Sequence, residues 1–182
     1  MELKLSDAAL QPLLRELTSL HQAAAAGKGI TLRLQAAADL PANLHTDVTR
    51  LRQILNNLLH NAVKFTQQGE IVLAVSTEGR GLNFAVTDPG VGIAEEDLPK
   101  LFQKFQQADG SISRRFGGTG LGLAISKQLI EQHGGTISAA AVDLGLAAAA
   151  ASRGHQPERS PRGAERHGRS GLRAVLGRPA AV

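Results

Sequence analysis

The sequence predicts a single domain with an α/β fold. The prediction rests on the composition and on two patterns of apolar residues, one typical of helices and one typical of strands. Apolar residues at helical spacing are clearest at 47–65, and short apolar runs typical of strands lie at 30–36, 71–76 and 82–86. The chain has 182 residues, 42% of them hydrophobic, which is enough for one buried core. Aromatic residues make up only 3% of the chain, so aliphatic side chains must form most of that core.

Helices and strands are expected to alternate along the chain. The expected elements are a helix or helix pair at 10–26, a strand at 30–36, a helix at 47–65, strands at 71–76 and 82–86, a helix at 121–130 and a strand at 136–141. Asp47 is the expected N-cap of the third element, whose buried stripe is Leu51, Leu55, Leu58 and Ala62. Gly79 and Gly81 predict a hairpin between the two middle strands.

The basic charge of the chain lies in its C-terminal tail. Residues 1–151 carry 13 Lys or Arg and 14 Asp or Glu, whereas 152–182 carry seven Arg and two Glu. One interpretation is an arm that binds nucleic acid or an acidic surface. We favour a disordered tail over 143–182, because Ala, Gly, Pro and Arg without apolar periodicity cannot offset chain entropy. No nucleic-acid partner is therefore expected.

Other classes of protein are disfavoured by what the sequence lacks. There is no cysteine, which excludes a disulfide framework and a thiolate metal site. No apolar run approaches the ~20 residues that a membrane span requires. The first residues, Met1-Glu2-Leu3-Lys4, do not resemble a signal peptide. We expect no membrane span in this chain.

Two glycine clusters and one polar helix face suggest a nucleotide site. The clusters are Asp88-Pro89-Gly90-Val91-Gly92 and Gly117-Gly118-Thr119-Gly120-Leu121-Gly122, and the second runs directly into an expected helix. Glycine lets backbone amides approach a ligand, and a helix N-terminus attracts an anion such as phosphate. Asn57, Asn61 and Lys64 share one face of the 47–65 helix. Taken singly, each cluster could be a plain turn, and the polar face could be merely solvated.

Together, these motifs resemble the ATP-binding catalytic domain of sensor histidine kinases, in the GHKL superfamily. The N box is Asn57 to Lys64, the G1 box Asp88 to Gly92, the F box Leu101 to Phe105 and the G2 box Gly118 to Gly122. The motifs follow the family's order and spacing over about residues 10–140, and Gln106 to Gly120 reads most like the hybrid-type kinases. The resemblance implies the GHKL, or Bergerat, ATP-binding fold. This is an α/β two-layer sandwich, a mixed sheet with helices on one face.

The resemblance also implies the roles of single residues. Asp88 would accept a hydrogen bond from the exocyclic amine of adenine, although a turn residue before Pro-Gly is the simpler interpretation. Asn61 would ligate Mg²⁺ beside phosphate oxygens, and Lys64 would neutralise phosphate charge. The expected cofactors are ATP and Mg²⁺. The remaining cofactor-binding residues are Asn57, Gly90, Gly92, Lys104, Gly118, Thr119, Gly120, Leu121 and Gly122.

Asn57 separates a kinase from a hydrolase. In the hydrolytic members of the superfamily its place is taken by a glutamate that activates water, and an amide cannot act as a general base. We therefore assign Asn57 and Lys64 to catalysis by a histidine kinase. The alternatives are a non-catalytic nucleotide-binding module and a GHKL-type ATPase.

The family implies partners that these residues do not supply. The six histidines lack the sequence setting of a phosphoacceptor, so we expect the acceptor on a dimerisation domain absent from this chain, with a response-regulator receiver domain next in the relay. Residues 1–26 would be a helical lead-in from that domain, and 27–142 the ATPase domain. The location would be cytoplasmic, as a separate protein or as part of a membrane-bound sensor.

The C-terminal end departs from the family. After Gly134 to Ser138 the family continues with a glycine-serine turn and a final amphipathic strand, whereas this chain passes through Ala147 to Ala151 into the tail. Arg without Lys, with abundant Ala, Gly and Pro, is typical of out-of-frame translation of GC-rich DNA. We hypothesise a truncated or frame-disrupted product without its last strand. The other reading frames of the coding DNA would test this.

Overall fold

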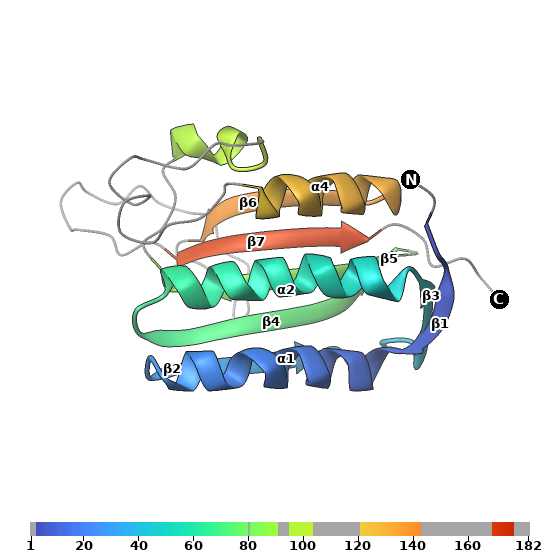
Figure 1. Cartoon of the computed structure of the whole chain (residues 1–182), viewed down its shortest axis with the longest axis horizontal. Helices are drawn as coiled ribbons and strands as arrows, with labels where there is room; N and C mark the ends of the chain where they lie inside the picture. The colour runs from blue at the N-terminus through green and yellow to red at the C-terminus, as the bar shows by residue number, and fades with distance from the viewer. Residues whose placement is uncertain (1–2, 80, 91–94, 104–120, 143–168, 177–182) are drawn as a thin grey trace, which may run out of the picture.

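The computed structural model describes residues 3–79, 81–90, 95–103, 121–142 and 169–176, which form helices layered on a sheet (Figure 1). The helices are α1 (Leu10–Ala26), α2 (Val48–Phe65), α4 (Gly122–Gln132) and a 3₁₀ helix η1 (Glu95–Lys100). The strands are β1 (Ser6–Ala9), β2 (Ile30–Ala36), β3 (Asn43–Thr46), β4 (Gly69–Glu78), β5 (Gly81–Asp88), β6 (Thr136–Val142) and β7 (Arg169–Leu176). No helix in these ranges is long and apolar enough to cross a membrane.

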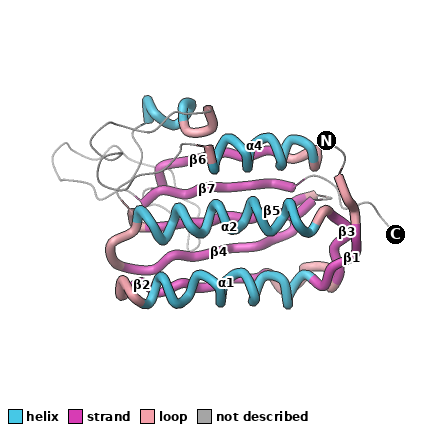
Figure 2. The backbone as a smooth tube through the Cα atoms, viewed as in Figure 1, coloured by secondary structure: helices cyan, strands magenta, loops and turns pink. Residues whose placement is uncertain are grey.

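The main sheet has five strands in the order β2-β4-β5-β7-β6, and β1 and β3 form a separate two-stranded sheet. The β2–β4 pair is parallel and the other pairs are antiparallel, so the main sheet is mixed. Figure 2 shows α1, α2 and α4 side by side over one face of it. The predicted two-layer sandwich, with a mixed sheet and helices on one face, is therefore confirmed.

The core lies between those two layers. Residues of β4 and β5 alternate between the helix-facing side and the open side, so that Ile71, Leu73, Val75, Phe84 and Val86 are buried. The four predicted stripe residues of α2 are buried against them. Aliphatic side chains make up nearly all of the core.

Local signals correctly predicted the start of α2 and the middle hairpin. Asp47 is the N-cap: its carboxylate accepts from the backbone N–H of Arg50 at 3.1 Å and from that of Lys4 at 2.9 Å. Burial alone would raise the pKa of Asp47, but these two hydrogen bonds and the charges of Arg50 and His133 lower it below its ordinary value. At the β4–β5 turn, Gly79 has a φ of 58°, which favours glycine.

Two expectations about the ends of the domain are wrong. Residues 10–26 are one helix whose Leu10, Leu13, Leu14 and Leu17 are buried in the common core, so α1 belongs to the sandwich and no boundary falls at residue 27. Residues 169–176, expected to be disordered, form β7 between β5 and β6. The rest of the expected tail, 143–168 and 177–182, lies outside the described residues.

Backbone pairing explains β7. The strand bonds to β5 on one side and β6 on the other, and its register sets Leu172, Ala174 and Leu176 opposite Val86, Phe84 and Leu82. Without it, both neighbours would leave rows of backbone N–H and C=O groups unpaired. The last strand that the sequence analysis expected to be missing is therefore present.

Candidate nucleotide site

The predicted site residues that the structure describes meet at one end of the sandwich. There α2 ends at Phe65 and β5 ends at Asp88, and α4 begins at Gly122 beside Asn57, half-way along α2, with its N-terminus facing the same end (Figure 1). Seven predicted residues are described: Asn57, Asn61, Lys64, Asp88, Gly90, Leu121 and Gly122. The other five lie outside the described residues: Gly92, Lys104, Gly118, Thr119 and Gly120.

Asp88 carries a buried and oriented carboxylate. The residue is 6% exposed, and its Oδ1 accepts from the backbone N–H of Gly90 at 2.9 Å and from the hydroxyl of Thr66 at 3.4 Å. The contact with Gly90 is what a turn residue before Pro-Gly would make. The burial of the carboxylate and its contact with the fully buried Thr66 go beyond that simpler interpretation. A fixed acceptor of this kind can select an N–H donor on a ligand.

Gly90 is required by the close approach of this turn to α2. A Cβ at Gly90 would clash with Oδ1 of Asp88 and would lie 3.0 Å from the carbonyl oxygen of Phe65. Gly69, at the start of β4, has a φ of 102°, and a Cβ there would lie 2.9 Å from Cγ of Pro89. The end of β5 is therefore packed tightly against the α2–β4 connection.

Asn57 joins α2 to α4. Its side-chain nitrogen lies 3.2 Å from the carbonyl oxygen of Gly122 and 3.2 Å from Oγ of Ser126, so it donates toward both. Ser126 is fully buried on α4. The carboxamide thus fixes the first turn of α4 relative to the polar face of α2, which is a structural contact that sequence reasoning did not foresee.

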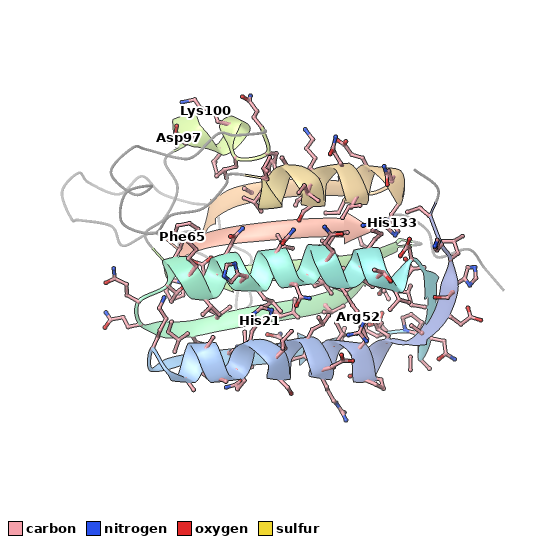
Figure 3. All side chains as sticks on the ribbon, in the orientation of Figure 1. His21, Arg52, Phe65, Asp97, Lys100 and His133 are labelled. Atoms are coloured by element: carbon pink, nitrogen blue, oxygen red, sulfur yellow. The ribbon has the colours of Figure 1, made fainter. Side chains whose placement is uncertain are left out.

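Asn61 and Lys64 follow Asn57 on the same side of α2, at the predicted helical spacing, and both are half-buried. Nζ of Lys64 lies 5.2 Å from the ring centroid of Phe65, within range of a cation–π contact. Figure 3 labels Phe65 at this end of α2. The amide and ammonium groups therefore lie in the last two turns of α2, whose C-cap residue, Thr66, contacts Asp88.

The residues present fit a magnesium ion held mainly by a ligand. Within the described ranges there is no group of three or more His, Cys, Asp or Glu side chains that could enclose a metal. The amide oxygen of the half-buried Asn61 is a hard donor. Magnesium commonly takes one or two protein oxygens together with water and phosphate oxygens.

The start of α4 can receive an anion. Its N-cap residue, Leu121, has no side-chain acceptor for the first backbone N–H groups of the helix. Those groups and the helix dipole point toward the end of the sandwich that holds the G1 and N boxes. Leu121 and Gly122 thus lie at the start of α4, where the sequence analysis expected a helix to begin.

Sequence reasoning missed the roles of Thr66 and Ser126. Thr66 is the C-cap of α2 and reaches Asp88, and Ser126 receives Asn57. A signal existed for each: Thr66 directly follows the N box, and Ser126 lies four residues after Gly122, one helical turn on. A small hydroxyl residue at such a position is a natural partner for a buried polar group.

Three of the four described histidines have a hydrogen-bonding partner. Nε2 of His21 lies 3.0 Å from Oδ1 of Asn56, Nδ1 of His45 lies 2.7 Å from Oδ1 of Asp7, and Nδ1 of His133 donates to the carbonyl of Leu129 at 2.7 Å. His60 is exposed on α2. His155 and His167 lie outside the described residues. Figure 3 places His133 at the end of α4 away from Phe65.

Comparison with known sequences finds one family over most of the chain. The model described as "Histidine kinase-, DNA gyrase B-, and HSP90-like ATPase" matches residues 46–170. The circadian input-output histidine kinase CikA of Synechococcus elongatus is 56% identical over 110 residues, which is 57% of this chain and 15% of CikA. The histidine-protein kinase BarA of Escherichia coli K12 is 43% identical over 134 residues, 71% of this chain and 15% of BarA. The chain thus spans about a seventh of each relative.

Solved structures agree in fold. Full-length ShkA in complex with AMPPNP superposes with a TM-score of 0.75 and 29% identity, over 100% of this chain and 33% of ShkA. The catalytic domain of histidine kinase ThkA, at 23% identity and a TM-score of 0.69, covers 97% of both chains and shows the fold alone. The chain therefore belongs to the family of histidine kinase-, DNA gyrase B- and HSP90-like ATPases, and within it resembles the catalytic domains of sensor histidine kinases in both sequence and fold.

Proposed function

We propose that this domain binds Mg²⁺-ATP at the end of the sandwich and transfers the γ-phosphoryl group to a histidine of a dimerisation domain that residues 1–182 do not supply. A response-regulator receiver domain would take the phosphoryl group next. The reaction would run in the cytoplasm, where ATP is abundant. The observation that carries the proposal is the buried carboxylate of Asp88, held by Gly90 and Thr66.

Asp88 is proposed to select adenine. The exocyclic amine of adenine offers an N–H donor to a carboxylate oxygen, whereas guanine presents a carbonyl at the equivalent position. Two acceptors facing each other would be repelled and left unpaired in a buried site. The same geometry therefore supports ATP over GTP.

Asn61, Lys64 and the start of α4 are proposed to hold the phosphates. Magnesium bound to the phosphate oxygens would neutralise charge, with Asn61 as its protein ligand. Lys64 would add a positive point charge, and the N–H groups following Leu121 would receive phosphate oxygens. Phosphoryl transfer depends chiefly on such positioning and charge stabilisation. Gly92, Lys104, Gly118, Thr119 and Gly120 are proposed to complete the site.

Asn57 supports a kinase in preference to an ATPase. An amide cannot take a proton from water, and its nitrogen already donates toward Gly122 and Ser126. We propose that Asn57 keeps the start of α4 in register with the N box, so that bound ATP is aligned for the acceptor histidine and is not hydrolysed. The non-catalytic alternative was based on a missing last strand, and the presence of β7 after β6 in the sequence supports the catalytic alternative instead.

Titration with a fluorescent ATP analogue, with and without Mg²⁺, tests the proposal. We expect saturable binding that strengthens with Mg²⁺. ATP should displace the analogue, and GTP at the same concentration should not. A purified dimerisation domain from a related sensor kinase then serves as acceptor for labelled ATP. Binding without transfer to this acceptor would favour the non-catalytic module. Steady ATP hydrolysis without an acceptor would favour the ATPase.

A further inference from the structure

Lys28 lies in the three-residue turn between α1 and β2, and its side chain reaches the end of α2. Nζ donates to the carbonyl oxygens of Val63 at 2.6 Å, Lys64 at 3.1 Å and Thr66 at 2.9 Å. An ammonium group has three N–H donors, so these contacts use its full capacity. The contacts join residues that are 35 to 38 positions apart in the chain.

The turn holds Lys28 in position for these contacts. The backbone N–H of Lys28 donates to Ala25 at 3.0 Å, and that of Gly29 donates to Ala26 at 2.9 Å. Gly29 has a φ of 70°, a conformation that glycine adopts readily and that reverses the chain into β2. The ammonium group is thus presented from a fixed backbone.

The end of a helix needs such a partner. The last carbonyls of α2 have no N–H donor within the helix, and they form the negative end of its dipole. A lysine that caps them supplies hydrogen bonds and opposite charge together. Lys28 therefore fixes the conformation of residues 63–66.

Residues 63–66 lie against Asp88 and Gly90 in the candidate nucleotide site. Lys64 belongs to this turn, the carbonyl of Phe65 packs against Gly90, and the hydroxyl of Thr66 lies 3.4 Å from Asp88. A shift of this turn would move the hydroxyl that orients the Asp88 carboxylate. The hydrogen bonds of the Lys28 ammonium group go to the backbone of this turn, so its influence on Asp88 would pass through the turn.

We propose that Lys28 is a positioning residue for adenine-nucleotide binding, acting through the C-terminal turn of α2 on Thr66 and Asp88; this inference rests on the proposed function. Replacing Lys28 by methionine removes the ammonium group and keeps an unbranched stem. The K28M variant is expected to bind ADP about tenfold more weakly at a temperature where it remains folded, which corresponds to weakening the proposed hydrogen bond between Asp88 and the nucleotide by about 1.4 kcal/mol.

A matched control and a double-mutant cycle separate positioning from general destabilisation. Lys127 is an exposed lysine on α4, 3.9 Å from Glu131, and K127M should leave the ADP affinity unchanged. In a D88N background, the effect of K28M should shrink to less than about threefold, because the two residues act on one contact. K28R keeps the positive charge and should recover part of the affinity. If K28M does not fold, K28Q, which also lacks the charge, replaces it in the cycle.

The outcomes distinguish this inference from the proposed function. If the wild-type chain binds no ADP by calorimetry, the proposed function fails. If the wild type binds but folded K28M (or K28Q, where K28M does not fold) binds equally well, the positioning role is overturned. The positioning role is also overturned if the losses of ADP binding free energy in K28M and D88N simply add in the double variant. A purely structural lysine would act independently of Asp88 and would give that result.

Discussion

Asp88→Asn is the substitution that probes the nucleotide site with least change in shape. In the wild type, Oδ1 of Asp88 accepts from Gly90 and Thr66. An asparagine must keep its oxygen at that position to satisfy the same donors, so its NH₂ group takes the place of Oδ2. The NH₂ group of the asparagine would then face the exocyclic amine of adenine, so that two N–H donors would meet with no acceptor between them.

The expected loss follows from the hydrogen bond that is removed. A hydrogen bond to a charged group contributes about 1.5–3 kcal/mol, and each 1.4 kcal/mol is a factor of ten in affinity. Asp88 is 6% exposed, so water cannot easily replace the lost partner. We therefore expect the dissociation constant for ATP or ADP to rise between about ten- and a hundredfold.

Isothermal titration calorimetry with ADP and Mg²⁺ measures this loss. Asp39→Asn is the matched control, because Asp39 is an exposed carboxylate that accepts from the hydroxyl of Thr77 at 2.6 Å, away from the end of β5 and the C-terminal turn of α2. The control should bind as the wild type does, and circular dichroism should confirm that both variants are folded. A folded Asp88→Asn variant with wild-type affinity would remove Asp88 from the adenine site.

Four further outcomes are expected. Asn61→Ala should abolish the Mg²⁺ dependence of ATP-analogue binding while leaving the thermal unfolding curve intact; full Mg²⁺ stimulation would show the N-box assignment to be wrong. Gly90→Ala should weaken ADP binding in calorimetry, because its Cβ would meet Asp88 and Phe65; wild-type affinity would mean that the turn adapts. Asp47→Ala should lower the free energy of unfolding by about 1 kcal/mol at pH 7. Because the pKa of Asp47 is lowered on folding, its contribution to the free energy of unfolding is present above about pH 4 and is lost below that. Urea denaturation should therefore find a smaller difference in unfolding free energy between variant and wild type at pH 3 than at pH 7. An equal difference at both pH values would refute this. Finally, the chain alone with labelled ATP and Mg²⁺ should gain no acid-labile phosphate; labelling would reveal an unrecognised acceptor.

Elements with strong local signals could be predicted from the sequence. The α2 helix has both a cap and a stripe of apolar residues, and β2 and α1 match their predicted bounds of 30–36 and 10–26. By contrast, β1 and β3 have four residues each and exist because they pair with one another across the chain. Such pairing is a tertiary effect that no local pattern carries.

Composition misled the prediction for the C-terminal end. Residues 152–182 are rich in Arg, Gly and Ala, which suggested disorder, yet Leu172, Ala174 and Leu176 alternate within the tail at the spacing of a strand. The edge of β5 that does not pair with β4 supplies the backbone partner that this short run needs. The composition of residues 152–182 as a whole therefore masked the strand pattern of a short segment within them.

The candidate site was predicted in its residues but not in its contacts. Motif order identified Asp88, Asn61 and Lys64, and the structure brings their elements to one end of the sandwich. The links from Asn57 to Ser126, from Thr66 to Asp88 and from Lys28 to the end of α2 join residues 22 to 69 positions apart. Contacts at such separations depend on how the layers stack, which the motifs do not encode.

Phosphoryl transfer to a supplied acceptor tests the central claim most directly. The chain would be incubated with γ-labelled ATP, Mg²⁺ and a purified dimerisation domain from a related sensor kinase, and acid-labile phosphate on that domain would be measured. We predict slow but measurable labelling, because free fragments lose the millimolar effective concentration that a short linker supplies. The labelling should disappear in Asp88→Asn. Saturated nucleotide binding with no label on the acceptor, even when the two domains are fused, would contradict the account.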